Sequence, residues 1–241
     1  YNSRLNMKIA IMQPYFMPYI GYWQLISAVD KFVLLDDVNY IMRGYINRNS
    51  ILLNGKPYRF TIPIEKASQN KLIKETKLNF TQENKATFLK TICSAYKKAP
   101  YFDDVMLLMI DVVNYTETDL TRFILHSIEK IMSYLNVDTE IFVSSEINKN
   151  NGLKAEGRII EICKKLGTDI YINPCGGRSL YRHSDFEEEG IELFFLETKK
   201  ENIIYKQRQD IFVENLSVID ILMYNDKQTV RNFLSEYALK K

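Results

Sequence analysis

The chain has 241 residues, of which 46% are hydrophobic and 26% charged, and its 32 Lys and Arg nearly balance its 30 Asp and Glu. A net charge of +2 is too small for the overall field to steer the protein to nucleic acid or anionic lipid, so neither is expected as its main target. No stretch approaches the ~20 uninterrupted apolar residues of a membrane span, which argues against membrane insertion.

Cysteine and histidine usage narrows the chemistry further. Cys93, Cys163 and Cys175 are widely spaced without a CxxC pattern, which is typical of reduced thiols in a cytoplasmic protein. Two histidines in the whole chain disfavour a His-based metal site, and we predict no metal ligands. Catalysis, if present, would depend on carboxylate, Arg, Lys, Asn and Tyr side chains.

The segment before Met7 is polar and lacks the apolar run of a signal peptide. We interpret residues 1–6 as an expression remnant or an upstream extension and leave them out of the fold prediction.

The residues after Met7 predict a βαβ unit. Residues 8–12 and 31–35 are short apolar runs typical of buried strands, and the Pro-containing stretch 13–21 separates the first run from a helix over 22–29. Two parallel strands joined by a right-handed crossover are expected from this order.

The next part of the chain predicts a hairpin and then helices. Asn54-Gly55 is a strong two-residue turn signal between the arms 51–53 and 58–62. From residue 81 to 135 the apolar side chains recur with a helical period, and Pro100 interrupts them. Three helices are therefore expected, the first from Thr81 and the others over 105–113 and 119–135.

The remaining sequence returns to an alternating α/β pattern. The expected elements are strands over 140–143, 169–172 and 191–196, a helix over 156–166 closed by Gly167, and a mainly helical tail over 216–237. The fold class predicted is α/β, with a Rossmann-like, mainly parallel sheet, a β-hairpin and a helical insertion over about 81–135. No linker rich in Pro, Gly or Ser is present, so residues 7–241 are predicted to form a single domain.

The first candidate ligand segment is Gln13-Pro-Tyr-Phe-Met-Pro-Tyr-Ile-Gly21, between the first strand and its helix. Ligands of open α/β sheets bind at the carboxyl ends of strands, beside helix N-termini that attract anions. Gln13 is a candidate catalytic residue, Gly21 allows close backbone approach, and Tyr15 could stack on a base or a sugar. A rigid turn capped by packed aromatic rings is the alternative.

The second candidate is the Asp36-Asp37 pair that ends the next strand. Adjacent carboxylates at a strand end can act as a general base or ligate Mg²⁺. A pair that caps the strand and begins a turn is an equally good interpretation.

The third candidate follows the acidic pair directly and contains Arg43, Asn47, Arg48 and Asn49. Guanidinium groups bind phosphates and carboxylates in a bidentate manner, and Asn amides bind polar ligand edges. The alternative is a solvated loop that leads into the hairpin.

The fourth candidate, Asn173 to Ser179, follows a later strand, and its Gly176-Gly177 pair could form an anion-binding nest. Cys175 invites a nucleophile hypothesis, but neither histidine is placed beside it, and a packed residue is the better interpretation.

The fifth candidate lies near the C-terminus and consists of Tyr205-Lys206-Gln207-Arg208 followed by the segment Leu216 to Leu222. Ser217 has the sequence context of a helix N-cap, with Asp220 at the third helical position of a capping box. Asp220 is retained as a possible substrate-binding residue.

Four stretches together resemble the WbqC-like protein family: IAIMQPYFMPYIGYWQLI, KFVLLDDVNYIMRGYINRNSILLNGKPYRFTIPI, DIYINPCGGRSLY, and YKQ followed by LSVIDILMYN. The resemblance runs from about Met7 to the C-terminus. The positions it carries over are Gln13, Pro14, Pro18, Gly21, Asp36, Asp37, Asn47, Arg48, Asn49, Asn173, Gly176, Gly177, Ser217 and Asp220.

The resemblance implies a role in bacterial O-antigen (lipopolysaccharide) or other surface-polysaccharide biosynthesis, where one proposal for the family is glycyl transfer to an amino sugar. The first loop is also similar to the phosphate-binding opening of nucleotidyltransferases with an HxGH motif. Its sequence Pro18 to Tyr22 lacks both histidines, which argues against HxGH chemistry and leaves nucleotide binding open.

The leading hypothesis is a cytoplasmic transferase that moves an aminoacyl (glycyl) or acyl group to the amine of a nucleotide-linked sugar. Its partners would be the nucleotide sugar and an acyl-carrier or aminoacyl donor; the cofactor is undetermined, either an activated acyl donor or ATP with Mg²⁺. Two alternatives stay open: a nucleotide-sugar-binding scaffold, and a Mg²⁺-dependent nucleotidyl or glycosyl transferase.

Overall fold

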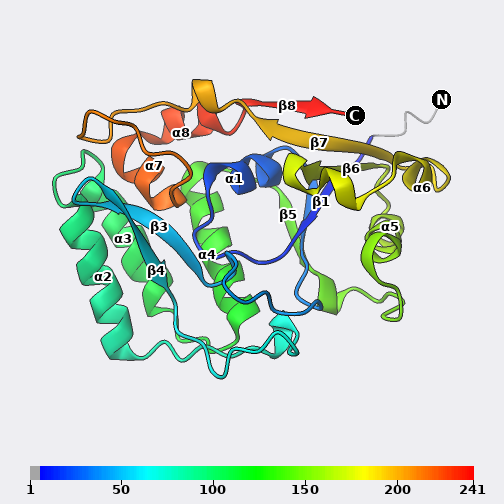
Figure 1. The fold of residues 1–241 in the computed structure, drawn as a ribbon, viewed down its shortest axis with the longest axis horizontal. Helices are drawn as coiled ribbons and strands as arrows, with labels where there is room; N and C mark the ends of the chain where they lie inside the picture. Colours follow the sequence, from blue (N-terminus) through cyan, green and yellow to red (C-terminus); the bar gives the residue numbers. More distant parts are fainter. Residues whose placement is uncertain (1–5) are drawn as a thin grey trace.

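The structure is a computed structural model that describes residues 6–241; the prediction for 1–6 therefore lies, except for Asn6, outside the described residues. One sheet has the strand order β5-β2-β1-β6-β7-β8, in which every neighbouring pair is parallel except β7 and β8 (Figure 1). The strands are β1 (Lys8–Met12), β2 (Lys31–Leu34), β5 (Glu140–Val143), β6 (Ile170–Pro174), β7 (Glu192–Thr198) and β8 (Tyr237–Lys240). The predicted α/β class with a mainly parallel sheet is confirmed.

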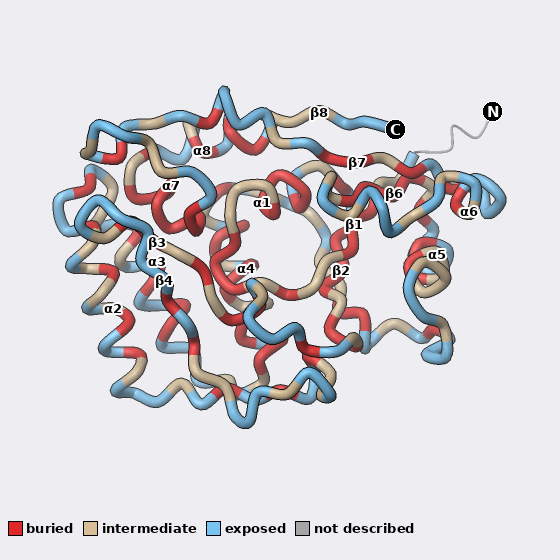
Figure 2. The backbone as a smooth tube through the Cα atoms, viewed as in Figure 1, coloured by how far each residue is buried: buried red, intermediate tan, exposed pale blue. Residues whose placement is uncertain are grey.

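Both faces of the central strands are buried, because their side chains alternate between two apolar clusters. Ala10 of β1 belongs to the larger cluster with Trp23 and Leu25 of α1 (Ile20–Ser27). Ile9 and Ile11 belong to the smaller cluster, with side chains of α5 (Ala155–Lys165) and α6 (His183–Glu187). Figure 2 shows these buried segments at the centre of the molecule. This two-sided burial explains why near-continuous apolar runs form parallel strands.

Three helices follow the hairpin in the chain and pack in the larger apolar cluster. They are α2 (Gln82–Tyr96), α3 (Phe102–Asn114) and α4 (Leu120–Leu135), beside the antiparallel hairpin of β3 (Arg48–Leu53) and β4 (Lys56–Thr61). The hairpin turns at Asn54-Gly55, where both residues have positive φ, as the sequence predicts. Thr81 caps α2 by accepting a hydrogen bond from the Asn84 amide.

The C-terminal segment differs in one respect from the expected helical tail. Helices α7 (Val218–Tyr224) and α8 (Lys227–Phe233) are present, but β8 then adds an antiparallel strand to the sheet edge. The four residues of β8 are half-buried or exposed, so they lack the apolar run from which the buried strands could be predicted. A buried Gln24 of α1 holds this segment by donating to the carbonyl oxygens of Phe233 and Glu236.

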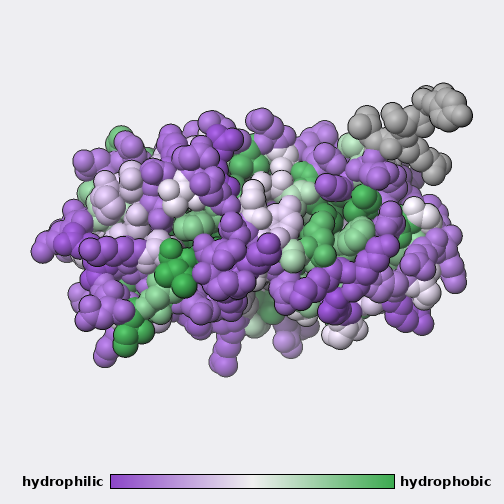
Figure 3. All heavy atoms as spheres, turned by 90° about the horizontal axis from the view of Figure 1, so that it is seen from above, coloured by the Kyte–Doolittle hydropathy of each residue, from purple (hydrophilic) through white to green (hydrophobic). Residues whose placement is uncertain are grey.

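The molecular surface gives no indication of a membrane span. No helix within residues 6–241 is long and apolar enough to cross a bilayer. On the face shown in Figure 3, hydrophobic side chains are exposed in separate groups among hydrophilic ones.

Candidate functional site

A cavity of about 570 Å³ lies at the carboxyl ends of β1, β6 and β7. The chain leaves β1 toward β2 through α1 and later returns to the other side of β1 as β6, so the strand order reverses between β1 and β6. This is the topological switch point, where open α/β sheets bind ligands. Met12, Pro174 and Cys175 line this switch-point cavity, together with Thr198, the last residue of β7, and Lys200.

A smaller, apolar cavity of about 120 Å³ adjoins the switch-point cavity. The two share Tyr19, Gly21, Thr198 and Lys200 in their walls. The rest of the lining is mainly apolar and comes from α1, α7 and the segment between β7 and α7: Ile20, Ile203, Tyr205, Phe212, Val213, Leu216 and Ile221, with Glu214 and Asn215.

A third cavity, of about 210 Å³, adjoins the apolar cavity through Glu214, Asn215 and Leu216. We call it the arginine cavity because Arg43, Arg48 and Arg59 line it. The three cavities thus follow one another in a row from the switch point to the hairpin, and we refer to the row as the cleft.

The three guanidinium groups of the arginine cavity have no ion-pair partner among residues 6–241. Arg48 Nε donates to the carbonyl oxygen of Gly44 at 2.8 Å, which fixes the stem of that side chain. Arg43 has a positive φ of 61°, a conformation that costs a non-Gly residue free energy. Three unpaired like charges around one hollow favour a bound anion, and phosphate oxygens match the planar guanidinium fork.

Tyrosine rings connect the arginine cavity with the other two. Tyr45 lines the arginine cavity and lies 5.9 Å, between ring centroids, from both Tyr15 and Tyr19. Tyr15 in turn stacks on Tyr22 at 5.3 Å. Burial raises the pKa of Tyr15 to about 12 and also raises the pKa of Tyr19. These phenols therefore stay protonated at neutral pH and offer ring faces and O–H donors.

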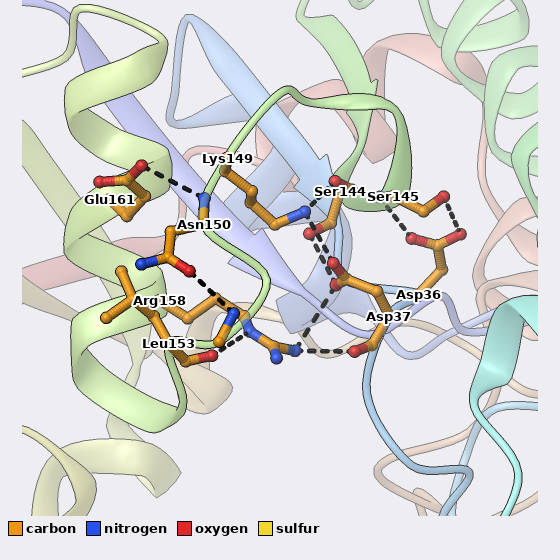
Figure 4. A network of polar contacts seen from close by, with 10 residues as sticks. Asp36, Asp37, Ser144, Ser145, Lys149, Asn150, Leu153, Arg158 and Glu161 are labelled. Atoms are coloured by element: carbon orange, nitrogen blue, oxygen red, sulfur yellow. Dashed lines mark hydrogen bonds and ion pairs between the residues drawn. The ribbon is translucent and has the colours of Figure 1, made fainter.

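The Asp36-Asp37 pair lies in a separate polar network at the ends of β2 and β5 (Figure 4). Asp36 accepts hydrogen bonds from the amide and the hydroxyl of Ser145, at 2.9 and 2.7 Å. Asp37 accepts from the Ser144 hydroxyl at 2.8 Å and forms an ion pair of 2.7 Å with Lys149. Neither carboxylate lines any of the three cavities.

Asp36, Asp37 and Lys149 are buried, and burial affects the two carboxyl groups differently. The side chains of Lys149 and Asp37 are 1% and 8% exposed. Burial raises the pKa of Asp36, although the bonds from Ser145 oppose it. Burial also acts to raise the pKa of Asp37, but the hydrogen bonds and charge of Lys149, the Ser144 bond and the charge of Arg158 outweigh it and lower that pKa. Both carboxyl groups thus have protein partners, hydrogen-bond donors for Asp36 and a cation for Asp37, as a strand-capping pair would have.

Arg158 of α5 completes this network. Its guanidinium donates to the backbone oxygen of Asp37 at 2.7 Å and to that of Leu153 at 3.0 Å. The contacts tie the β2 end, the segment after β5 and α5 together (Figure 4).

The predicted asparagines have interior hydrogen-bond partners. Asn47 accepts from the Tyr40 hydroxyl and donates to the Ile62 carbonyl, and Asn49 donates to the Met17 carbonyl at 3.0 Å. Asn49 also lines the arginine cavity. Asn47 holds the start of the hairpin, whereas Asn49 ties β3 to the Pro-containing loop.

The loop after β6 is also internally packed. Asn173 is 5% exposed and accepts from the Tyr171 hydroxyl at 3.0 Å. A Cβ on Gly177 would come within 2.2 Å of Asn173 Nδ2, whereas one on Gly176 would meet nothing within 4 Å. Burial raises the pKa of the Cys175 thiol, and the Glu197 charge adds to this, so the thiol form dominates near neutral pH.

The expected capping box at Ser217 and Asp220 is only half formed in the structure. Ser217 is the N-cap of α7, since its hydroxyl accepts from the Ile219 amide, but the Ser217 amide donates to the Ser50 carbonyl and not to Asp220. The Asp220 carboxylate is fully buried and instead accepts from Tyr96, Tyr205 and Gln207, at 2.8, 2.6 and 2.9 Å. Burial raises its pKa, and the three donors oppose the rise. The Ser217 cap is therefore present, but tertiary contacts replace the predicted hydrogen bond from the Ser217 amide to Asp220.

Of the predicted site residues, four line the cleft: Gly21, Arg43, Arg48 and Asn49. Tyr15 lies beside it, against the rings of Tyr22 and Tyr45. Gln13 follows β1, and its backbone oxygen accepts from Tyr22. The cleft residues that the sequence did not single out include Arg59, Thr198, Lys199, Lys200 and Glu214. Thr198 to Lys200 could have been found, because they end β7 as Gln13 ends β1, and the same strand-end rule applies.

The doubly wound, mainly parallel sheet and the cleft at its carboxyl edge define a Rossmann-like α/β protein with a candidate small-molecule site. Within this class, residues 13–232 match the WbqC-like protein family, and the chain belongs to that family. An uncharacterized protein of Mycobacterium tuberculosis, Rv1507c, is 27% identical over 217 residues, which cover 89% of this chain and 92% of the relative. No solved structure matches the chain.

Proposed function

We propose that this protein is a cytoplasmic enzyme of surface-polysaccharide biosynthesis that transfers an aminoacyl or acyl group to the amine of a nucleotide-linked amino sugar. The observation that supports it is the cleft, which joins three unpaired arginines at one end to the switch point of the sheet at the other. Such a row of cavities suits a substrate with an anionic part and a separate reacting group.

The arginine cavity suits the diphosphate of a nucleotide sugar. Arg43, Arg48 and Arg59 would together offset the two negative charges of a diphosphate, and each fork can give two parallel hydrogen bonds. The exposed ring of Tyr45 borders the same cavity and could stack on the base or the sugar.

Glu214 is placed to bind the amine of the amino sugar. It is the only carboxylate lining the arginine cavity or the apolar cavity among the described residues, and it lies where the two meet. Its ion pair with Lys200, at 3.3 Å, joins side chains 54% and 58% exposed, so it is weak and readily exchanged for a substrate ammonium. In the reaction, the bound ammonium first gives one proton to Glu214, the neutral amine nitrogen then bonds to the acyl carbon, and the leaving group departs with its electron pair and takes up the second nitrogen proton.

The acyl donor would approach from the switch-point side, as a carrier thioester or as an adenylate made from ATP and Mg²⁺. The role of Asp36 or Asp37 as base or Mg²⁺ ligand and the catalytic role of Gln13 remain predictions. The proposed transfer does not depend on the Asp pair, because Ser144, Ser145 and Lys149 already bind its oxygens.

The test is incubation with UDP- and dTDP-linked amino sugars and a panel of activated donors, followed by mass spectrometry. We expect an added acyl mass on the sugar, reduced at least about tenfold in Glu214→Gln with retained sugar-nucleotide binding. Glu187→Gln, which changes an exposed carboxylate that lines none of the three cavities, is the control. Nucleotide-sugar binding without any transfer would contradict the enzyme proposal and favour the scaffold alternative.

A further inference from the structure

The apolar cavity is the one part of the cleft whose chemistry the proposed transfer leaves unassigned. Its walls include Ile203, Leu216 and Ile221, which are 6%, 4% and 4% exposed. Thr198, Lys200, Glu214 and Asn215 are shared with the neighbouring cavities, and the hydroxyl of Tyr205, which lines only this cavity, is bound to Asp220. The cavity is therefore apolar inside and polar where it meets the rest of the cleft.

The walls are held in place by buried hydrogen bonds. Tyr205 donates to the buried Asp220, and its ring packs edge-on against Phe212 at 5.1 Å. The buried Gln207 side chain donates to the carbonyl of Val213 at 2.9 Å and accepts from its amide at 2.7 Å. Because both ends of the 205–213 segment are fixed in this way, the cavity is preformed.

We propose that the apolar cavity binds the hydrocarbon chain of the transferred acyl group, and that this chain is short and apolar. This inference rests on the proposed transfer. A cavity near 150 Å³ holds a benzene ring, so about 120 Å³ holds a chain of about four or five carbon atoms. A glycyl group would leave this space empty and would bring an ammonium to apolar walls, which is unfavourable. The preferred donor is thus a short-chain acyl donor, and glycyl is disfavoured.

The first experiment measures binding without turnover. With Ile methyl groups labelled for NMR, butyramide should shift the signals of Ile20, Ile203 and Ile221 in a saturable way and leave that of exposed Ile204 unchanged. Glycinamide is the polar comparison and should shift none of them. Absence of shifts at the three cavity methyls, or equal shifts with glycinamide, would overturn the subsite.

Neighbouring substitutions give a matched pair. Ile203→Phe fills the cavity and should weaken butyramide binding at least about tenfold, as misfit of one or more methylenes does. Ile204→Phe changes a side chain that is 63% exposed and should leave binding unchanged. If Ile203→Phe does not fold, Ile203→Ala is used; it enlarges the cavity and should shift preference toward hexanamide. A folded Ile203→Phe protein with unchanged binding would overturn the inference.

The donor panel separates this inference from the proposed transfer. Transfer of glycyl as efficiently as butyryl, with no effect of Ile203→Phe on either, would leave the enzyme in place and overturn the subsite. Saturable butyramide shifts without transfer from any donor would support the subsite and contradict the transfer.

Discussion

Two charged regions of this protein have similar sequence patterns and opposite electrostatics. At the ends of β2 and β5, the carboxylate of Asp37 is buried with Lys149 and hydrogen-bonded to Ser144. In the arginine cavity, Arg43 and Arg48 face solvent-accessible space without a carboxylate partner in the described chain. The first region has its charges balanced within the protein, whereas the second leaves a charge for something else to balance.

The difference shows how polar residues at strand ends can be sorted. A side chain whose hydrogen bonds and charge are satisfied internally stabilises the fold, and removing it leaves a buried partner unpaired. A charged group that lines a cavity without a partner contributes little to stability and is available to a ligand. The predictions below set substitutions in the two regions against each other.

The largest effect is expected from Asp37→Asn. It removes the charge that balances Lys149, whose side chain is 1% exposed, and should lower the free energy of unfolding by about 3 to 5 kcal/mol. Urea denaturation measures this. The control Glu189→Gln breaks an exposed pair with Lys164 and should cost less than about 1 kcal/mol. Equal costs for both variants would refute a stabilising role for the buried pair.

The buried ion pair of Asp37 and Lys149 also predicts that the stability of the fold depends on pH. The pKa of Asp37 in the folded protein is lowered below its ordinary value of 3.8. The unfolded state therefore binds the proton more readily, so the contribution is complete above the ordinary pKa and is lost as the pH falls through the folded pKa. Denaturation at several pH values should show a smaller acid-side loss in Asp37→Asn than in the unsubstituted protein.

Substitution in the arginine cavity should change affinity and leave stability intact. Arg48→Gln removes a charged donor and should weaken binding of a nucleoside diphosphate by roughly ten- to a hundredfold, measured by calorimetry at fixed salt. Arg122→Gln, in a surface pair with Glu146, should leave the affinity unchanged. A large loss of stability with unchanged affinity would contradict this prediction and show that Arg48 stabilises the fold, as Asp37 does.

The smallest effect separates packing from anion binding in the loop after β6. Gly177→Ala forces the buried Asn173 amide to move and should cost about 1 to 3 kcal/mol, whereas Gly176→Ala has free space and should cost little. Thermal unfolding of the two variants provides the comparison. If Gly176→Ala were equally destabilising, close packing against Asn173 would not explain the requirement for glycine.

The fold was largely predictable because its signals are local. Residues 8–12 and 31–34 are apolar on both faces, and Asn54-Gly55 determines its own turn. The edge strand β8 was not predictable, since pairing with β7 decides its conformation and its side chains are largely solvated.

The sequence predicted where the candidate site lies, but not which of its polar side chains already have partners within the protein. The strand-end rule leads to Gln13, and the dense run after the acidic pair leads to Arg43 and Arg48, but nothing in the sequence indicates that Lys149 lies buried against Asp37. Asp220 fits a capping box locally, yet Tyr96 and Tyr205, distant in sequence, determine its hydrogen bonds. Whether a polar group is already satisfied is a property of tertiary contacts.

The position of β1 in the sheet has a consequence for folding during synthesis. β1 pairs with β2 on one side, but its other neighbour, β6, emerges much later, and Gln24 of α1 finds its carbonyl partners only in the final residues. β2 likewise lacks its outer neighbour β5, so the N-terminal βαβ unit must wait on the ribosome with both sheet edges unpaired. Such non-local pairing slows folding and exposes the edges to aggregation, so expression yield should depend on chaperones that shield nascent chains.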